Sequence, residues 1–314
     1  MKFATYRIGG VRRVGVLVNG GLLDLAGAYR LVYGSEPPRF LLELKSLIEY
    51  GSRGLELVKL VVSEALREME SGSELAHALK KEVFHDSSEV VFEPPIHNPG
   101  KVLCMAVNYW SHARETSTEP PEVPYLFVKL SSTLVGHRAT VVFPRGTQRA
   151  DYEVELAVVI GRRGKYVSRD KAMDYVFGYT ILNDLSIRER QAPLPKSPRL
   201  GLRWLPGKNF DTSTPLGPFV VTSDEVPDPH NLRLGTRVNG EVRQDSTTSE
   251  MVFKIPEIVE AVTDGLTLEP GDIIATGTPA GVGLGTGKYL KHGDVVEAWI
   301  EGIGVLTNYV VFET

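Results

Sequence analysis

The segment Asp151-Tyr-Glu-Val-Glu-Leu-Ala-Val-Val-Ile-Gly161 decides the fold of this chain. Successive side chains of a β-strand point to opposite faces, so Glu153 and Glu155 lie on the same face. The run 157–160 is apolar on both faces, which predicts a strand that is buried on both sides. Two carboxylates on such a strand raise each other's pKa unless a cation compensates them.

A divalent metal ion is the simplest compensating cation. Ligation by oxygen alone favours Mg²⁺, Mn²⁺ or Ca²⁺ over zinc. A third carboxylate is available from Asp184, which follows the apolar run 179–182. The alternatives are a half-exposed strand with two solvated glutamates, and an Asp184 that serves only in a turn or a helix cap. The residues alone leave these alternatives open.

From Lys101 onward the sequence consists mostly of short β-branched runs separated by Gly, Pro, Asn and Asp. The expected strands are 102–107, 140–143, 152–160, 176–182, 219–222, 234–238, 273–276, 295–300 and 305–312. A helix is expected at 256–262, and Asn239-Gly240 predicts a hairpin turn. Because regular intervening helices are missing, a doubly wound sheet and a (β/α)₈ barrel are disfavoured. We expect an α+β, β-dominated catalytic domain over residues 96–314.

The first 95 residues have a different pattern. Two β-rich runs precede three stretches with helical spacing, and these five segments are 3–8, 14–18, 40–50, 55–69 and 74–81. Helix breakers in Glu93-Pro94-Pro95 mark a boundary. We therefore predict a small α+β domain over residues 1–95.

Composition narrows the class of protein. The 314 residues carry a formal charge of −4 and are 42% hydrophobic, which indicates a globular protein and disfavours nucleic acid as a partner. The only cysteine, Cys104, cannot form an intramolecular disulfide or a thiolate zinc cluster. No stretch has the length of a signal peptide core or a membrane span. We expect a cytoplasmic protein without a membrane partner.

His112 and Glu115 form the first candidate catalytic pair. On a helical turn, residues three apart share a face, so Glu115 could orient the imidazole and raise its basicity. Such a pair suits a general base that acts on water. A surface His–Glu pair is the alternative.

Other candidates surround these segments. Ser186 and Glu189 fit a capping box, and the helix that they would start places Arg188 and Gln191 on one side. The glycine-rich stretch from Thr276 to Gly287 fits neither common nucleotide-binding pattern, but its backbone and Thr278 could approach an anion, with an ordinary turn as the alternative. Lys129 and Lys208 are two further candidates, and the alternative for each is a solvated surface charge.

Taken together, these segments resemble the fumarylacetoacetate hydrolase family in its short bacterial and archaeal form. The resemblance runs in order over about residues 100–310, and its ordered set of motifs is specific. The matching motifs include Asn108-Tyr109, His112 with Glu115, Pro124–Lys129, Asp151–Gly161, Asn183–Arg188, Gly207-Lys208, Pro270–Asp272 and Thr276–Pro279.

The resemblance implies a mixed β-sandwich roll, a homodimer and a divalent metal, Mg²⁺ or alternatively Mn²⁺ or Ca²⁺. It maps the three metal-ligating carboxylates onto Glu153, Glu155 and Asp184, and the catalytic pair onto His112 and Glu115 in a lid segment. The implied substrate contacts are Lys208, Thr278, Gln191, Arg188 and Lys129. The stretch from Gln191 to Arg203 departs from the family pattern, so substrate preference is not predicted there.

The resulting hypothesis is a metal-dependent enzyme that acts on a 2-oxo acid or a 1,3-dicarbonyl through a metal-stabilised enolate. Hydrolysis of a C–C bond in an acylpyruvate-like or fumarylacetoacetate-like substrate is the first expectation. The alternatives are a 2-hydroxyhepta-2,4-diene-1,7-dioate isomerase or decarboxylase and a 2-keto-3-deoxy sugar-acid dehydratase, because all can share the enolate. A non-catalytic member that binds a metal or a ligand is an alternative of another class.

Overall fold

Strand β11 (Val154–Ile160) lies at the centre of the structure, a computed structural model that describes all residues from Met1 to Thr314. Every residue of β11 is buried, as the apolar run predicts. It pairs antiparallel with β12 (Val176–Asn183) on one side and with β17 (Ile273–Ala275) on the other. The strand that carries Glu155 is therefore an interior strand.

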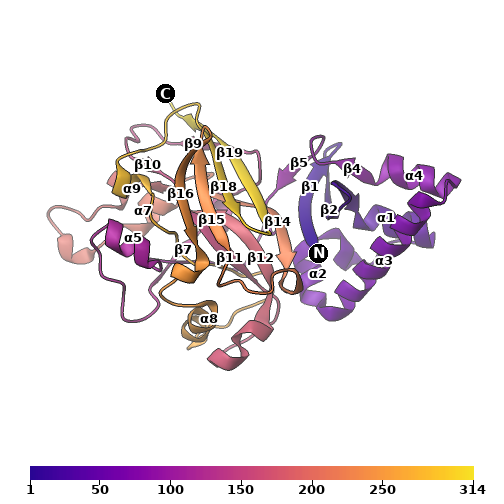
Figure 1. Ribbon diagram of the computed structural model, residues 1–314, viewed down its shortest axis with the longest axis horizontal. Helices are drawn as coiled ribbons and strands as arrows, with labels where there is room; N and C mark the ends of the chain where they lie inside the picture. Colours follow the sequence, from indigo (N-terminus) through magenta and orange to yellow (C-terminus); the bar gives the residue numbers. More distant parts are fainter.

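The large sheet around β11 has twelve strands and crosses the whole molecule (Figure 1). Beyond β12 the order continues through β14 (Thr214–Thr222), β1 (Lys2–Ile8), β2 (Val11–Val18), β3 (Gly21–Asp24) and β4 (Phe84–Asp86). Beyond β17 follow β6 (Val102–Met105) and β7 (Leu126–Lys129), while β5 (Val91–Glu93) pairs with β1 and β8 (Leu134–Val135) with β14. The pairs β17–β6 and β14–β8 are parallel and the others antiparallel, so the sheet is mixed.

A second sheet of five strands packs against the large one. Its order is β16 (Glu241–Thr247), β15 (Arg233–Val238), β18 (Val295–Ile300), β19 (Gly304–Phe312) and β9 (Thr140–Phe143). The even-numbered residues of β11 point into the core between the two sheets. Residues of α8 (Ile255–Thr263) extend this core. These two packed sheets confirm the α+β, sandwich-type fold class.

The opposite face of β11 is covered by the N-terminal segment. Ala157 and Val159 share a core with residues of α2 (Leu44–Tyr50) and α3 (Ser52–Glu70). Helices α1 (Leu25–Tyr33) and α4 (Glu74–Glu82) complete this part, on the right in Figure 1. Because the large sheet and this core both run across residue 95, the division into 1–95 and 96–314 stays a prediction.

Short elements at the other end of the molecule carry some of the candidate site residues. They are β10 (Ala150–Asp151), β13 (Ser186–Ile187), α5 (Trp110–Glu115), α6 (Arg188–Gln191), α7 (Trp204–Lys208) and α9 (Gly283–Thr286). Several of them lie together on the left in Figure 1. His112 and Glu115 are on α5, Arg188 and Gln191 on α6, and Lys208 on α7. The remaining short helices are of the 3₁₀ type: Arg39–Leu42, Ser131–Thr133, Arg169–Tyr175, Pro198–Leu200, Ser223–Glu225 and Thr248–Glu250.

Three local predictions differ from the structure. The strand expected at 102–107 ends at Met105, and Val107 adopts a left-handed conformation (φ 53°) that turns the chain into α5. The helix expected at 40–50 begins as a 3₁₀ turn before α2. The expected capping box is absent, because the Ser186 hydroxyl donates to the carbonyl of Asp184 and Glu189 accepts from backbone N–H groups of a neighbouring loop. No helix is both long and apolar enough to span a bilayer.

Candidate metal centre and active site

Three carboxylates from three positions in the chain meet in the interior. Glu153 immediately precedes β11, Glu155 lies within β11, and Asp184 follows β12. One oxygen of each side chain lies within 4.8 Å of the others, and all three residues are buried. The antiparallel register of β11 and β12 brings the three carboxylates together, because Glu155 pairs with Leu182 and Val154 pairs with Asn183. The sheet therefore brings together the three acids that the sequence singles out.

Two buried lysines compensate part of this negative charge. Lys208 Nζ donates to Glu153 Oε2 at 2.7 Å and to Asp184 Oδ2 at 2.5 Å. Lys129 Nζ lies 2.8 Å from Asp184 Oδ1 and also donates to the backbone carbonyl oxygens of Lys208 and Ser213. Burial alone would lower the pKa of Lys208, but Asp184 and Glu153 raise it above the ordinary value. Both lysines are thus interior charges rather than surface charges.

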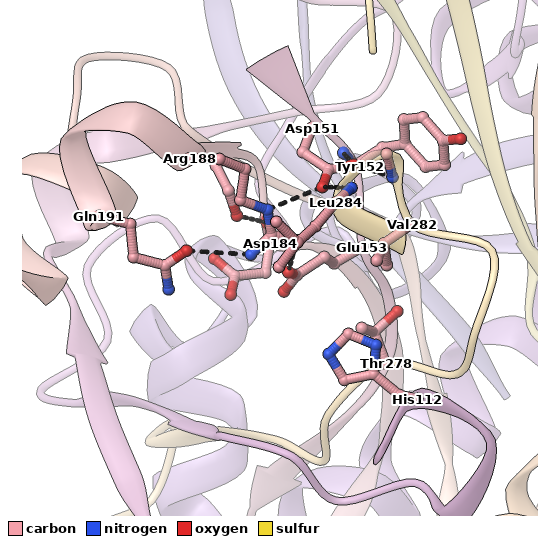
Figure 2. Close-up of polar contacts among 12 residues, drawn as sticks. His112, Asp151, Tyr152, Glu153, Asp184, Arg188, Gln191, Thr278, Val282 and Leu284 are labelled. Carbon is pink, nitrogen blue, oxygen red and sulfur yellow. Dashed lines mark hydrogen bonds and ion pairs between the residues drawn. The ribbon is translucent and has the colours of Figure 1, made fainter. Parts of the chain in front are cut away.

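Glu153 is held in its ionised form by its neighbours. It accepts hydrogen bonds from Lys208 and from Nη2 of Arg188. Burial on its own would raise the pKa of Glu153, but Lys208, Arg188 and then His112 outweigh burial and lower it to about 2. Arg188 also donates from Nη1 to Gln191 Oε1 at 3.0 Å (Figure 2).

Glu155 lacks such a partner. Its carboxylate accepts one hydrogen bond, from the backbone N–H of Gly277 at 2.8 Å, and forms no ion pair. Burial, then Asp184 and Glu153, raise the pKa of Glu155 well above its ordinary value. A buried carboxylate without a cation, beside two others within ligand distance, fits a hard divalent ion. The donor set is all oxygen, so the residues present fit Mg²⁺, Mn²⁺ or Ca²⁺.

The candidate catalytic pair lies on α5. His112 Nδ1 is 3.8 Å from Glu115 Oε2, and neither atom has a hydrogen-bond partner within the protein. Glu115 Oε1 accepts from the backbone N–H of Gly281 at 2.9 Å. His112 and Thr278 line the same cleft (Figure 2). The pair is therefore anchored to the glycine-rich stretch after β17 rather than lying free on the surface.

Thr278 belongs to a network that the sequence did not indicate. Its hydroxyl oxygen accepts from Gln244 Nε2 at 2.9 Å, and Gln244 Oε1 in turn accepts from the backbone N–H of Val154. Gln244 comes from β16 in the second sheet and is 1% exposed. The Thr278 hydroxyl donates no hydrogen bond within the protein, so it can donate its proton into the cleft.

Most of these groups line a cleft of about 450 Å³, but the buried Asp184 and Gln244 do not. The polar and charged side chains of its lining include His112, Glu115, Glu153, Glu155, Arg188, Gln191, Lys208 and Thr278. The larger apolar side chains of its lining are Met105, Val107, Phe127, Leu202, Trp204 and Leu284. The rings of Phe127 and Trp204 stack at 4.5 Å. A larger hollow of about 690 Å³ beside α8 contains none of the predicted site residues.

Known proteins match this chain over the same region. The sequence model described as fumarylacetoacetate (FAA) hydrolase C-terminal matches residues 101–311. The chain is a member of the fumarylacetoacetate hydrolase family. A mitochondrial oxaloacetate tautomerase of Bos taurus is 48% identical over 226 residues, which cover 71% of this chain and 70% of that protein.

Solved structures of fumarylacetoacetate hydrolase family proteins match the whole chain. A fumarylacetoacetate hydrolase from Exiguobacterium antarcticum superposes with a TM-score of 0.75 at 33% identity, and the match covers 100% of both chains. A maleylpyruvate hydrolase from Sphingobium sp. SYK-6, in complex with manganese(II) and pyruvate, superposes with a TM-score of 0.73 at 28% identity and the same coverage. The chain thus belongs to a family of enzymes, and a divalent metal at the acidic cluster is supported.

Lys129 does not line the cleft, and its 0%-exposed side chain pairs with Asp184. It compensates charge in the carboxylate cluster, and the substrate contact that the family resemblance implies for it stays a prediction. The other candidate substrate contacts, Lys208, Thr278, Gln191 and Arg188, all line the cleft.

Two further residues of the site were missed by the sequence analysis. Asn108 donates to the carbonyls of Thr276 and Phe253 and accepts from the Phe253 N–H, so it fixes the start of the glycine-rich stretch. Asp151 is fully buried and bonds to Arg188. Their sequence signal was present, because both lie inside the motifs that carry the family resemblance.

Proposed function

We propose that the protein is a divalent-metal-dependent enzyme that converts a 2-oxo acid into its enol through proton transfer at the carbon beside the oxo group. The observation that carries the proposal is the position of His112 in the same cleft as Glu153 and Glu155. A base close to a site that stabilises negative charge on oxygen is the arrangement that enolisation requires.

The leading specific reaction is keto–enol tautomerisation of oxaloacetate or a similar 2-oxo acid. It is supported by the 48% identity with an oxaloacetate tautomerase over 226 residues. Tautomerisation also needs nothing beyond one base and one site for the oxygen charge. A divalent ion held by Glu153, Glu155 and Asp184 would supply Lewis-acid stabilisation of that charge.

His112 performs the proton transfer in this proposal. Because Nδ1 faces Glu115, Nε2 is the nitrogen that serves the cleft. Nε2 takes a proton from the carbon beside the oxo group, the C–H electron pair forms the C=C bond, and the oxo oxygen takes the negative charge. Return of the proton to that oxygen gives the enol. Glu115 stabilises the imidazolium while it holds the proton.

Three neutral or cationic donors can hold the substrate's oxygens. Lys208 uses two of its three N–H groups on Glu153 and Asp184, which leaves one for the substrate. The Thr278 hydroxyl and the Gln191 amide are further donors, since the Gln191 carbonyl oxygen is already bonded by Arg188. They suit a carboxylate and its adjacent oxo group.

Hydrolysis of an acylpyruvate C–C bond is the second candidate. It is favoured by the His112–Glu115 pair, which could also activate a water molecule, and by a cleft whose 450 Å³ leaves room for an acyl group. An isomerase, decarboxylase or dehydratase would use the same enolate. The homodimer is likewise a proposal, which light scattering tests by giving twice the monomer mass.

The test incubates the purified protein with Mg²⁺ or Mn²⁺ and with oxaloacetate, acylpyruvates, diene-dioates and 2-keto-3-deoxy acids. Faster ketonisation of enol-oxaloacetate, followed by ultraviolet absorbance, supports the tautomerase. Release of pyruvate and a carboxylic acid from an acylpyruvate, identified by NMR, favours the hydrolase. If no substrate reacts while Mg²⁺ and oxalate still bind, the protein is a non-catalytic binding member and the proposal fails.

A further inference from the structure

Asp151 has every acceptor position of its carboxylate occupied. Oδ1 accepts from the backbone N–H groups of Tyr152 at 2.8 Å and Gly283 at 2.5 Å. Oδ2 accepts from the backbone N–H of Leu284 at 2.8 Å and from Nε of Arg188 at 2.7 Å (Figure 2). A carboxylate offers about four lone-pair sites, so this side chain has no capacity left for a ligand. It also does not line the cleft.

The first consequence concerns Arg188. Its Nε bonds to Asp151, while its Nη2 bonds to Glu153 and its Nη1 to Gln191. A guanidinium is planar and rigid, so fixing Nε fixes the direction of the other two nitrogens. Asp151 therefore orients the group that holds Glu153, one of the three carboxylates of the candidate metal centre.

The second consequence concerns α9, which lies beside the catalytic pair. Gly283 and Leu284 begin α9, and the next residue, Gly285, lies directly against Glu115. A Cβ atom on Gly285 would come within 2.2 Å of Glu115 Cδ, so the backbone there leaves no free space. Holding the first two N–H groups of α9 thus fixes the surface against which Glu115 packs.

We propose that Asp151 is a positioning residue that keeps the carboxylate cluster and the His112–Glu115 pair at a fixed separation. One side of its carboxylate holds Arg188 and thereby Glu153, and the other side holds α9 and thereby Glu115. This inference rests on the proposed function for its effect on turnover, but its effects on backbone protection and metal affinity can be measured without any substrate.

Asp151→Asn is the first test variant because it keeps the size and most of the shape. The amide has one acceptor oxygen and one donor NH₂, and an NH₂ group cannot accept a hydrogen bond. With NH₂ in place of Oδ2, the bonds from Leu284 and Arg188 are lost. With NH₂ in place of Oδ1, the bonds from Tyr152 and Gly283 are lost, so α9 loses at least one of its two bonds in either orientation.

Asp24→Asn is the matched control. Asp24 is also 0% exposed, caps a helix through the Ala26 N–H and pairs with an arginine, Arg13. It lies in the N-terminal part of the molecule, as the last residue of β3 and the N-cap of α1, and does not line the cleft. A change that acts through stability alone therefore affects both variants in the same way.

Three experiments are carried out on both variants: amide hydrogen exchange of the segment 282–287, calorimetry for the Mn²⁺ affinity, and steady-state kinetics for kcat and KM. For Asp151→Asn we expect faster exchange in that segment and a loss of about 10- to 100-fold in metal affinity or in kcat, with a smaller change in KM. For Asp24→Asn we expect only a lower melting temperature. If both variants lose only thermal stability, the proposal is overturned.

A second pair keeps the test decisive if Asp151→Asn does not fold. Leu284→Pro removes one N–H donor to Asp151, at a first-turn position where proline is tolerated, and Leu284→Ala removes the same side chain but keeps the donor. We expect a larger kcat loss in the proline variant, and equal losses would contradict the proposal. If the wild type turns over no substrate, the proposed function fails, while exchange and Mn²⁺ affinity still decide the role of Asp151.

Discussion

Lys129 Nζ lies 2.8 Å from Asp184 Oδ1, and both side chains are 0% exposed. Removal of Lys129 leaves only Lys208 to compensate the buried Asp184, and breaking a buried ion pair costs about 3–5 kcal/mol. Lys129→Met should therefore lower the free energy of unfolding by about that amount, measured by denaturant titration of the metal-free protein.

Lys288→Met is the control for this prediction. Lys288 Nζ is 2.8 Å from Glu241 Oε1, but both side chains are more than half exposed. An exposed pair contributes about 0–1 kcal/mol, so this variant should unfold close to the wild type. If the two lysine variants lost equal free energies of unfolding, burial of the ion pair with Asp184 would not explain the loss in Lys129→Met.

The raised pKa of Glu155 predicts an unusual pH dependence of the free energy of unfolding. Because burial, Asp184 and Glu153 raise its pKa, its contribution is fully present below its unfolded pKa of about 4.3 and is lost as the pH rises through the raised value. Metal-free Glu155→Gln should thus be more stable than the metal-free wild type at about pH 8, and this difference should shrink toward about pH 4.

The stability difference between Glu153→Gln and the wild type should have the opposite sign. Lys208 and Arg188 overcome burial and lower the pKa of Glu153 to about 2, so its contribution is present above about pH 4.3 and is lost as the pH falls toward 2. Metal-free Glu153→Gln should therefore be less stable than the wild type at about pH 8. Thermal unfolding across the pH range checks both signs, and a stabilised Glu153→Gln would contradict the charge assignment.

Much of the fold follows from local patterns, since strands such as β9 and β18 begin and end where the sequence predicts. The helix α1 was missed because its glycine and two tyrosines weaken the helical signal. Strand β16 was missed although the Asn239-Gly240 turn implies a partner for β15. It is largely polar, so it lacks the β-branched run that marked the predicted strands.

The acids of the site were predictable because a buried interior strand makes carboxylates costly. The hydrogen bonds that orient them were not, because each joins residues that are far apart in the sequence. Gln244 bonds to Val154 ninety positions away, and Asp151 bonds to Gly283 from 132 positions away. No periodicity or spacing rule connects such residues, and only the completed sheet brings them together.

His112→Ala should separate catalysis from metal binding. The imidazole is the proposed base but is not among the three clustered carboxylates, so turnover should fall by about 10²–10⁴-fold while Mn²⁺ affinity stays unchanged. Glu153→Ala should abolish both. Calorimetry with Mn²⁺ beside steady-state kinetics makes the comparison, and full activity in either variant would refute the role assigned to that residue.

Gly285→Ala should disturb the catalytic pair without removing any polar group. Its Cβ would meet Glu115 Cδ at 2.2 Å and Oε1 at 2.7 Å, so the carboxylate must move away from its bond to Gly281. A displacement of about 1 Å can cost up to about 100-fold, and the loss should appear in kcat rather than in Mn²⁺ affinity. Adding Glu115→Asp shortens the crowded side chain by one methylene and should restore part of the activity in the double variant. If kinetics of the four proteins show no such coupling, the contact between α9 and Glu115 does not govern the reaction.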